Sequence, residues 1–299
     1  MNGIFPAVLT MFDAQGNLDE QATWNHADWL ISQGVHGLVA AGTSGEFVAL
    51  NEAERRRVIE VVIDATQRRV PVLAGTGYYS TRQTIETTQW AEAKGAAGAL
   101  VILPYFLKPP KAAVFDHYRQ LKRSTSLPIL LYNNPANSAC EELKSWEMAE
   151  LAREGTLQGV KSTMATTTPV VDLAVLCPPE FRIFYGSFMS ALEGLLAGAH
   201  GWISGILNFL PAQAVALYEA CAIHRDVEKA RQIWYGIVPF VQLYFRPRHG
   251  PVHDLPLWRA GLELMGLHGG YSRAPLLPLT AEQRSDLAQV MLQAGMLES

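Results

Sequence analysis

Leu157-Gln158-Gly159-Val160-Lys161-Ser162 is a short, largely apolar run that predicts a buried strand, and it carries a lysine close to its end. Burial disfavours the charged form of an amine, and a neutral amine can attack a carbonyl carbon. For most lysines the better interpretation is a side chain just past a strand end with its ammonium in water. The apolar surroundings of Lys161 favour the rarer interpretation, a nucleophile that forms a Schiff base.

Short runs rich in Val, Ile and Leu recur along the chain, with amphipathic stretches between them. There are eight: 4–10, 35–41, 70–75, 99–103, 128–132, 158–162, 181–186 and 201–204. Near-continuous hydrophobicity is typical of parallel strands covered on both faces, and repeated strand–helix units imply a parallel sheet. Eight such units predict a closed (β/α)8 TIM barrel, and a doubly wound open sheet is the alternative architecture.

Helix start signals lie between the runs, at Asn51, at Ser80 and at Pro211. We predict that residues 1–210 form the catalytic barrel region. Residues 211–299 should form the last barrel helix and a C-terminal helical region. No flexible linker or repeat separates the two parts, so this C-terminal region is not expected to fold independently.

The composition of the chain argues against some classes of binding partner. The chain has 299 residues, 49% of them hydrophobic, and a net charge of -4 without a long basic run. Nucleic acid and membrane surfaces are therefore not expected partners. Three widely spaced cysteines argue against a disulfide framework, and no signal-like or membrane-spanning stretch is apparent, so we expect a cytoplasmic protein that binds a small molecule.

The eight histidines are scattered, without a metal-binding spacing beside a carboxylate. His249 and His253 fall in an expected loop rather than on one helix face. No metal site is therefore predicted.

The C-terminal ends of barrel strands form the active site in this architecture, and several of these ends are polar here. Gly42-Thr43-Ser44-Gly45 has the character of an anion-binding turn, because glycines let backbone N–H groups converge while hydroxyls add donors. A carboxylate is the expected guest. An ordinary strand-to-helix turn is the alternative, and a phosphate site lacks the following Lys of a P-loop.

Tyr132 ends the run before that of Lys161, so its phenol should lie near the amine. Forming and collapsing a carbinolamine both need proton transfers, which a phenol linked to a hydroxyl such as Ser44 could supply. The alternative is a tyrosine whose ring packs and whose hydroxyl meets solvent.

Taken together, these residues resemble the dihydrodipicolinate synthase and N-acetylneuraminate lyase family of class I aldolases over essentially the whole chain. The matching motifs are Ala41-Gly42-Thr43-Ser44-Gly45-Glu46, Tyr132-Asn133-Asn134-Pro135, Gly159-Val160-Lys161 and Gly201-Trp202-Ile203-Ser204. The resemblance implies a barrel with a C-terminal helical region, a homotetramer built as a dimer of dimers, and no metal or organic cofactor. It further implies an imine between Lys161 and a 2-oxo acid, a carboxylate held by Thr43 and Ser44, and Tyr132 as acid and base.

Two positions depart from the pattern of the lysine-pathway synthases in that family. Asn137 stands where those enzymes have an Arg that grips the second substrate, and Phe106 stands where they have a Tyr that crosses to the partner subunit. Losing a charge-assisted clamp of about 1.5 to 3 kcal/mol argues against their second substrate, aspartate semialdehyde.

The leading hypothesis is therefore a Schiff-base lyase, an aldolase or dehydratase, acting through Lys161 on pyruvate, a related 2-oxo acid or a 2-keto-3-deoxy sugar acid. The predicted catalytic residues are Lys161, Tyr132 and Ser44. The predicted substrate-binding residues are Thr43, Gly42, Gly45, Phe106, Asn137, Gly186, Ser187 and Ile203. The alternatives are 4-hydroxy-tetrahydrodipicolinate synthase itself and a non-catalytic barrel that senses a 2-oxo acid.

Overall fold

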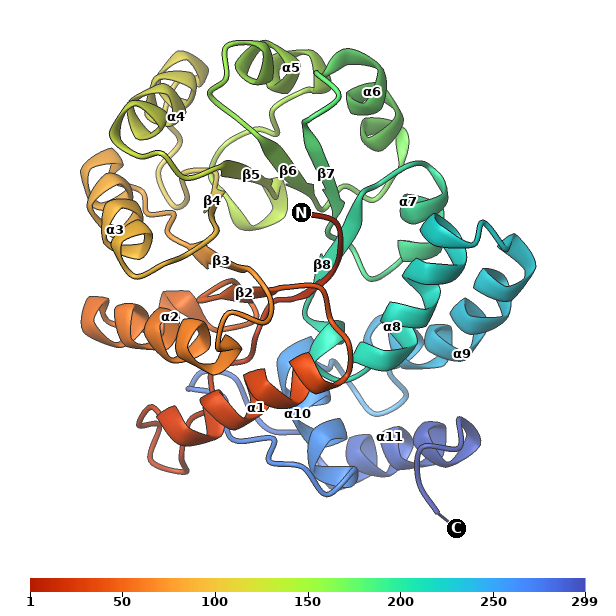
Figure 1. The fold of residues 1–299 in the computed structure, drawn as a ribbon. Helices are drawn as coiled ribbons and strands as arrows, with labels where there is room; N and C mark the ends of the chain where they lie inside the picture. Colours follow the sequence, from red (N-terminus) through yellow and green to blue (C-terminus); the bar gives the residue numbers. More distant parts are fainter. Residues whose placement is uncertain (299) are drawn as a thin grey trace.

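Eight parallel strands form the centre of the computed structural model, which describes residues 1–298 (Figure 1). Their bounds are β1 Gly3–Pro6, β2 Leu38–Ala40, β3 Val72–Gly75, β4 Gly98–Ile102, β5 Ile129–Asn133, β6 Gly159–Ser162, β7 Arg182–Tyr185 and β8 Gly201–Ser204. Consecutive strands from β2 to β8 pair side by side, and β8 pairs with β1. A parallel bridge between Ala7 and Val39 and the bond from Val8 N to Val39 O (2.9 Å) join β1 to β2. The predicted barrel is confirmed, and the open sheet is excluded.

Eight helices surround the barrel, one after each strand. They are α1 Glu20–Ser32, α2 Glu52–Thr66, α3 Thr81–Ala93, α4 Lys111–Ser124, α5 Ser145–Arg153, α6 Thr168–Leu176, α7 Ala191–Leu196 and α8 Pro211–Tyr218. Two of the predicted start signals act as helix caps: Asn51 forms a capping box with Glu54, and the Ser80 side chain accepts from Gln83 N. The third, Pro211, is the first residue of α8.

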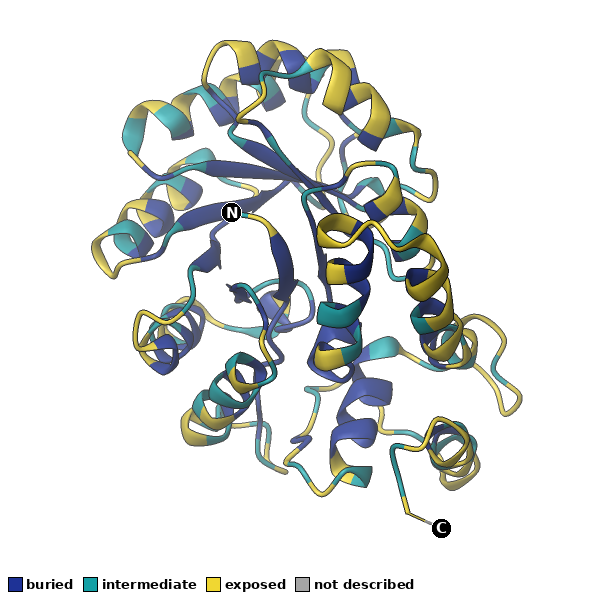
Figure 2. Cartoon of the chain, turned by 45° about the vertical axis from the view of Figure 1, so that its right-hand side comes forward, coloured by how far each residue is buried: buried dark blue, intermediate teal, exposed yellow. Residues whose placement is uncertain are grey.

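The remaining elements are short turns of helix and a C-terminal helical region. The 3-10 turns are η1 Phe47–Ala49, η2 Pro135–Asn137 and η3 Ile206–Asn208, and η4 Glu219–Ile223 is a π-helix. After it come α9 Val227–Phe245, α10 Asp254–Leu264 and α11 Ala281–Gln293. Figure 2 shows that the strands are buried, apart from the partly exposed Arg182 at the start of β7, while the helices are exposed on their outer faces. Within residues 1–298, no helix combines the length and the apolarity needed to cross a bilayer.

Alternate strand residues fill the barrel interior. The buried cluster there includes Phe5, Val39, Leu73, Leu100, Leu130, Phe184 and Ile203. Gly201 makes room for this layer, because a Cβ added to it would lie 2.1 Å from Gly3 O and 2.8 Å from the Phe184 ring. The interior is thus a packed core, which leaves the end of the barrel formed by the C-termini of the strands as the place for a site.

The first strand is shorter than the apolar run that predicted it. The run extends to Thr10, but β1 ends at Pro6. Beyond it, Leu9 N bonds the Asn208 side chain and the Thr10 hydroxyl donates to Gly45 O. This segment is apolar because it is buried as a loop against the barrel, and apolarity alone does not distinguish a buried loop from a strand.

Two buried histidines should make stability depend on pH. Burial lowers the pKa of His26 to about 4 and that of His117 to about 4. An unfolded histidine titrates near 6.5, so between pH 6.5 and pH 4 the unfolded chain binds more protons than the folded one. The free energy of unfolding therefore decreases as the pH is lowered through this window. Each histidine should contribute a loss of roughly 3 kcal/mol across that window.

Thermal unfolding between pH 7.5 and pH 4.5 would measure this slope. His117→Gln should flatten it, whereas the exposed His224→Gln should leave it unchanged. Equal slopes in all three proteins would contradict the assignment.

Candidate active site

Lys161 lies inside the barrel on β6, and its side chain is buried. The residue is 5% exposed, pairs in register with Tyr132 on β5, and has Phe184 on its other side on β7. Its Nζ lies 4.0 Å from the centroid of the Tyr132 ring. None of the ion pairs between described residues involves Lys161. A buried amine held against an aromatic face, rather than by a carboxylate, remains available for a reaction.

The phenol of Tyr132 meets an amide rather than a hydroxyl. Asn134 Nδ2 donates to Tyr132 Oη over 2.9 Å, and both side chains are buried. Asn134 directly follows β5, so this neighbour comes from the same strand end, and the link from Tyr132 to Ser44 stays a prediction. As an acceptor from Asn134, the phenol directs its own proton elsewhere, which suits a proton donor.

The turn that follows β2 is closed by its own backbone hydrogen bonds, and its binding of an anion stays a prediction. Gly45 N donates to Gly42 O (3.0 Å), and Gly45 O accepts from the Thr10 hydroxyl (2.7 Å). A Cβ at Gly45 would lie 3.0 Å from Val8 O, so the close backbone approach there favours glycine. Thr43 Oγ1 is buried and has no hydrogen-bond partner within residues 1–298. A buried hydroxyl without a partner is costly, and a bound carboxylate would satisfy it.

Two glycines lie against the reactive side chains. A Cβ at Gly186 would be 2.5 Å from Thr163 Cγ2 and 3.0 Å from Lys161 Cε. A Cβ at Gly205 would be 2.6 Å from Ser44 Oγ. The lysine stem and the serine hydroxyl therefore occupy space that only glycine leaves open.

The structure brings some of the remaining predicted residues to the barrel mouth and leaves others outside. Ile203 belongs to the interior layer, and Ser187 accepts through Oγ from Met189 N beside the β7 end. Asn137 is exposed on η2, and Phe106 is 92% exposed with a positive φ of 75°. Whether these last two face a substrate remains a prediction.

The sequence analysis missed Arg55, which is buried near the β3 end. From α2 its guanidinium donates to Gly75 O (2.6 Å) and Gly77 O (3.0 Å), and it lies 4.2 Å from the Tyr78 ring centroid. Burial lowers the pKa of Arg55. Its position one turn after the Asn51 cap gave no sign that it points inward. Arg55 holds the loop after β3 in place.

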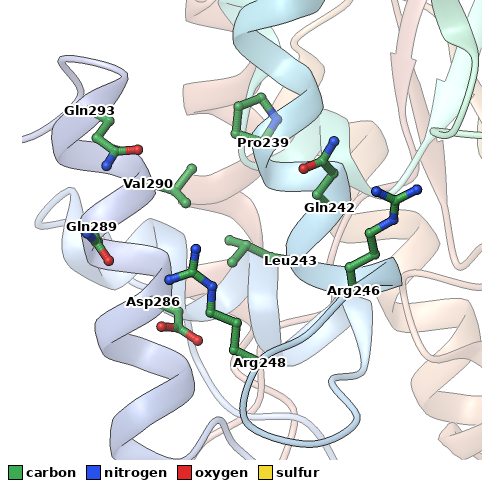
Figure 3. Close-up of a pocket in the computed structure, with 9 residues that line it drawn as sticks. All are labelled: Pro239, Gln242, Leu243, Arg246, Arg248, Asp286, Gln289, Val290 and Gln293. Carbon is green, nitrogen blue, oxygen red and sulfur yellow. The ribbon is translucent and has the colours of Figure 1, made fainter.

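A separate cavity of about 240 Å³ lies between α9 and α11 (Figure 3). Its lining includes Arg246, Arg248 and Asp286, and Asp286 also contacts His249 (2.8 Å). Lys161, Tyr132 and Thr43 are not among its lining residues, so this cavity is distinct from the barrel mouth. In the described part of the chain, no group of three or more His, Cys, Asp or Glu side chains could hold a metal ion.

Comparison with known proteins agrees with this arrangement. The model of the dihydrodipicolinate synthetase family matches residues 1–294. The 4-hydroxy-tetrahydrodipicolinate synthase of Teredinibacter turnerae is 34% identical over 98% of both chains, and that of Methanopyrus kandleri is 33% identical over 99% of this chain and 97% of its own.

Solved structures show the same likeness. YagE, a prophage protein of the dihydrodipicolinic acid synthase family from Escherichia coli K12 in complex with pyruvate, is 31% identical with a TM-score of 0.90 over 99% of both chains. The chloride-inhibited dihydrodipicolinate synthase of Acinetobacter baumannii, complexed with pyruvate, is 29% identical with the same TM-score and coverage. With its fold, its buried lysine and these matches along its length, the chain belongs to the dihydrodipicolinate synthetase family of Schiff-base-forming lyases.

Proposed function

We propose that this protein forms an imine between Lys161 and pyruvate or a related 2-oxo acid, and then makes or breaks a bond at the adjacent carbon. The observation that carries the proposal is the buried Lys161 amine, 4.0 Å from the Tyr132 ring centroid and without an ion-pair partner in the described chain. Two similar structures contain pyruvate, which supports this substrate class.

The chemistry balances without a cofactor. The Lys161 amine attacks the ketone carbon, and the carbinolamine loses water to give a protonated imine. The imine withdraws electrons, so the neighbouring carbon can lose a proton and add to an aldehyde, or the reverse cleavage can run. Tyr132 supplies and accepts the protons, and water finally releases the product.

The substrate carboxylate belongs at the turn after β2. Thr43 and Ser44 offer hydroxyls beside Gly42 and Gly45, and the buried Thr43 Oγ1 has no partner among residues 1–298. A carboxylate there would accept short, charge-assisted hydrogen bonds. The carboxylate would then orient the ketone toward Lys161.

In a condensation, we propose that the second substrate is an aldehyde other than aspartate semialdehyde. In a cleavage or dehydration, we propose a 2-keto-3-deoxy sugar acid as the substrate. The resemblance places a carboxylate-binding Arg at the position of Asn137, and Asn137 carries no charge. Parallel assays with pyruvate plus aspartate semialdehyde, and with a panel of 2-keto-3-deoxy sugar acids, would compare the two. Turnover confined to the first pair would favour the alternative, 4-hydroxy-tetrahydrodipicolinate synthase.

We also propose a homotetramer, built as a dimer of dimers. Two exposed apolar features support it: Phe106 on the loop after β4, and Val171 with Val175 on α6. Val171 and Val175 lie four residues apart and share one face of α6, and contiguous exposed apolar residues are typical of protein interfaces. Light scattering after gel filtration would measure the mass, and Phe106→Glu and Val175→Glu should each reduce it.

Borohydride trapping tests the proposal directly. Incubating the protein with pyruvate and borohydride should add a reduced pyruvyl mass to the peptide that contains Lys161. An unlabelled Lys161 peptide, under conditions that label a known aldolase with a Schiff-base lysine, would overturn the proposed imine. Reversible binding of pyruvate without labelling would instead favour a non-catalytic sensor.

Tyr132→Phe should slow imine formation while keeping the ring packed against Lys161. Losing a positioned proton donor lowers rates by roughly 10²- to 10⁴-fold. The measurement is the rate at which trappable imine accumulates with pyruvate. Tyr185→Phe is the matched control, because Tyr185 is also buried but its hydroxyl contacts Ser190 (2.6 Å), away from the site. Equal rates in the two variants would remove Tyr132 from the mechanism.

A further inference from the structure

A buried ion pair joins the C-terminal helical region to the turn after β2. Arg259 on α10 and Glu46 are 213 residues apart, yet Arg259 Nη2 lies 2.8 Å from Glu46 Oε1, and each side chain is only 4% exposed. Glu46 directly follows Gly42-Thr43-Ser44-Gly45. Taking two charges out of water is costly, so this pair calls for an explanation.

The guanidinium of Arg259 holds the turn by two routes. Besides Glu46, Nη2 donates to Thr10 O over 2.7 Å, and the Thr10 hydroxyl donates to Gly45 O over the same distance. The remaining donors are satisfied by Gly269 O (2.8 Å) and Ser272 Oγ (3.1 Å). One side chain therefore fixes Glu46 directly and Gly45 through Thr10, and its fork-shaped donor set suits this role better than an ammonium would.

The backbone at Glu46 needs such support. Its φ of 54° lies in the left-handed region, which a residue with a Cβ rarely adopts. Conformations of this kind persist when their surroundings over-determine them. Glu46 Oε2 also accepts from Arg273 N over 2.9 Å, so both carboxylate oxygens are held by residues that follow the barrel.

The neighbouring residue on α10 lies against the same part of the site. Trp258 is fully buried, and its Nε1 lies 3.5 Å from the position that a Cβ of Gly205 would occupy. Ser44 Oγ lies 2.6 Å from that same position. Trp258 and Ser44 therefore both lie beside Gly205, so α10 reaches the neighbourhood of the hydroxyl-bearing turn.

We propose that Arg259 and Glu46 are positioning residues that set the conformation of the turn 42–45, and thereby the affinity for the substrate carboxylate. Neither residue touches the substrate in this proposal. Their effect passes through Thr43 and Ser44, and the idea rests on the proposed function because it needs imine formation as its readout.

Comparing two ketones separates positioning from mere folding. Pyruvate carries a carboxylate, whereas methyl pyruvate carries an uncharged ester at the same place. In the wild-type protein, trapping should reach half its maximum at a lower concentration of pyruvate than of methyl pyruvate. Arg259→Met should raise the half-maximal concentration of pyruvate by about tenfold or more. This is the change expected when the displaced turn no longer makes one charge-assisted hydrogen bond to the substrate carboxylate. The value for methyl pyruvate should stay within about twofold, so the preference for the carboxylate collapses.

Further variants guard against a folding artefact. Arg259→Lys keeps the charge and should restore part of the preference, and Glu46→Gln, which keeps the shape of the side chain, should reduce it. Leu287→Ala is the matched control. Leu287 is fully buried on α11, so its truncation should loosen the same helical region without touching the turn.

The outcomes are distinct. A carboxylate preference that is unchanged in folded Arg259→Met or Glu46→Gln, or an equal loss for both ketones, would overturn the positioning role. The same loss of preference in Leu287→Ala would also overturn it. If the wild-type protein is labelled by neither ketone, the proposed function itself fails, and the inference falls with it.

Discussion

Lys161→Met should lower turnover at least about a thousandfold and abolish borohydride trapping, because the imine forms on the Lys161 amine. Methionine has a similar length and no nucleophilic nitrogen. Since Lys161 is buried without an ion-pair partner within residues 1–298, replacing its amine by a thioether should leave the melting temperature equal or raise it. Opposite changes in activity and stability are the signature of a group kept for chemistry.

Lys161→Arg is the control for charge. The guanidinium stays protonated and cannot form the imine, so this variant should also be inactive, while a lysine needed only as a cation would tolerate it. Turnover and differential scanning calorimetry on all three proteins test the prediction. A large fall in melting temperature in Lys161→Met, or residual trapping at another peptide, would contradict it.

Gly186→Ala should also lower activity strongly, although Gly186 has no side chain of its own. The added Cβ would meet Thr163 Cγ2 at 2.5 Å and Lys161 Cε at 3.0 Å, so the lysine stem or β6 must shift. A displacement of about 1 Å at the reacting atom can cost about a hundredfold in rate. We therefore expect kcat to fall by that order, with a smaller change in KM.

A second-site change should reverse part of this loss. Thr163→Ser removes the Cγ2 that the new methyl would meet and keeps the hydroxyl bonded to Asn133 O (3.1 Å). The double variant should recover activity, whereas Thr163→Ser alone should be nearly neutral. Gly236→Ala, in open space on α9, should retain full activity and gain up to about 1 kcal/mol of stability. No recovery in the double variant would place the damage elsewhere.

The sequence was sufficient to predict the barrel and the pairing of Tyr132 with Lys161. Eight apolar runs imply a fixed strand order, and in a parallel barrel the ends of consecutive strands are neighbours. The same logic placed Gly42-Thr43-Ser44-Gly45 at the correct end. Strand periodicity also bears on Asn134, because a residue two positions after Tyr132 tends to the same side, and its contact with the phenol could have been anticipated.

Other features could not be predicted for a physical reason. The contact between Glu46 and Arg259 depends on how α10 docks after all eight strands have closed, and no local pattern encodes a partner 213 residues away. Arg55 is a charged residue in a helix whose other arginines include exposed ones, so its inward direction follows from packing alone. The exposure of Phe106 likewise depends on a loop conformation with positive φ.

The ion pair between α10 and the turn after β2 also has a consequence for how the protein matures. During synthesis the N-terminal strands leave the ribosome long before Arg259 and Arg273 do. Until those two arginines emerge, Glu46 lacks both of its partners. The turn after β2 therefore gains these buried contacts only after the polypeptide that follows the barrel has been made.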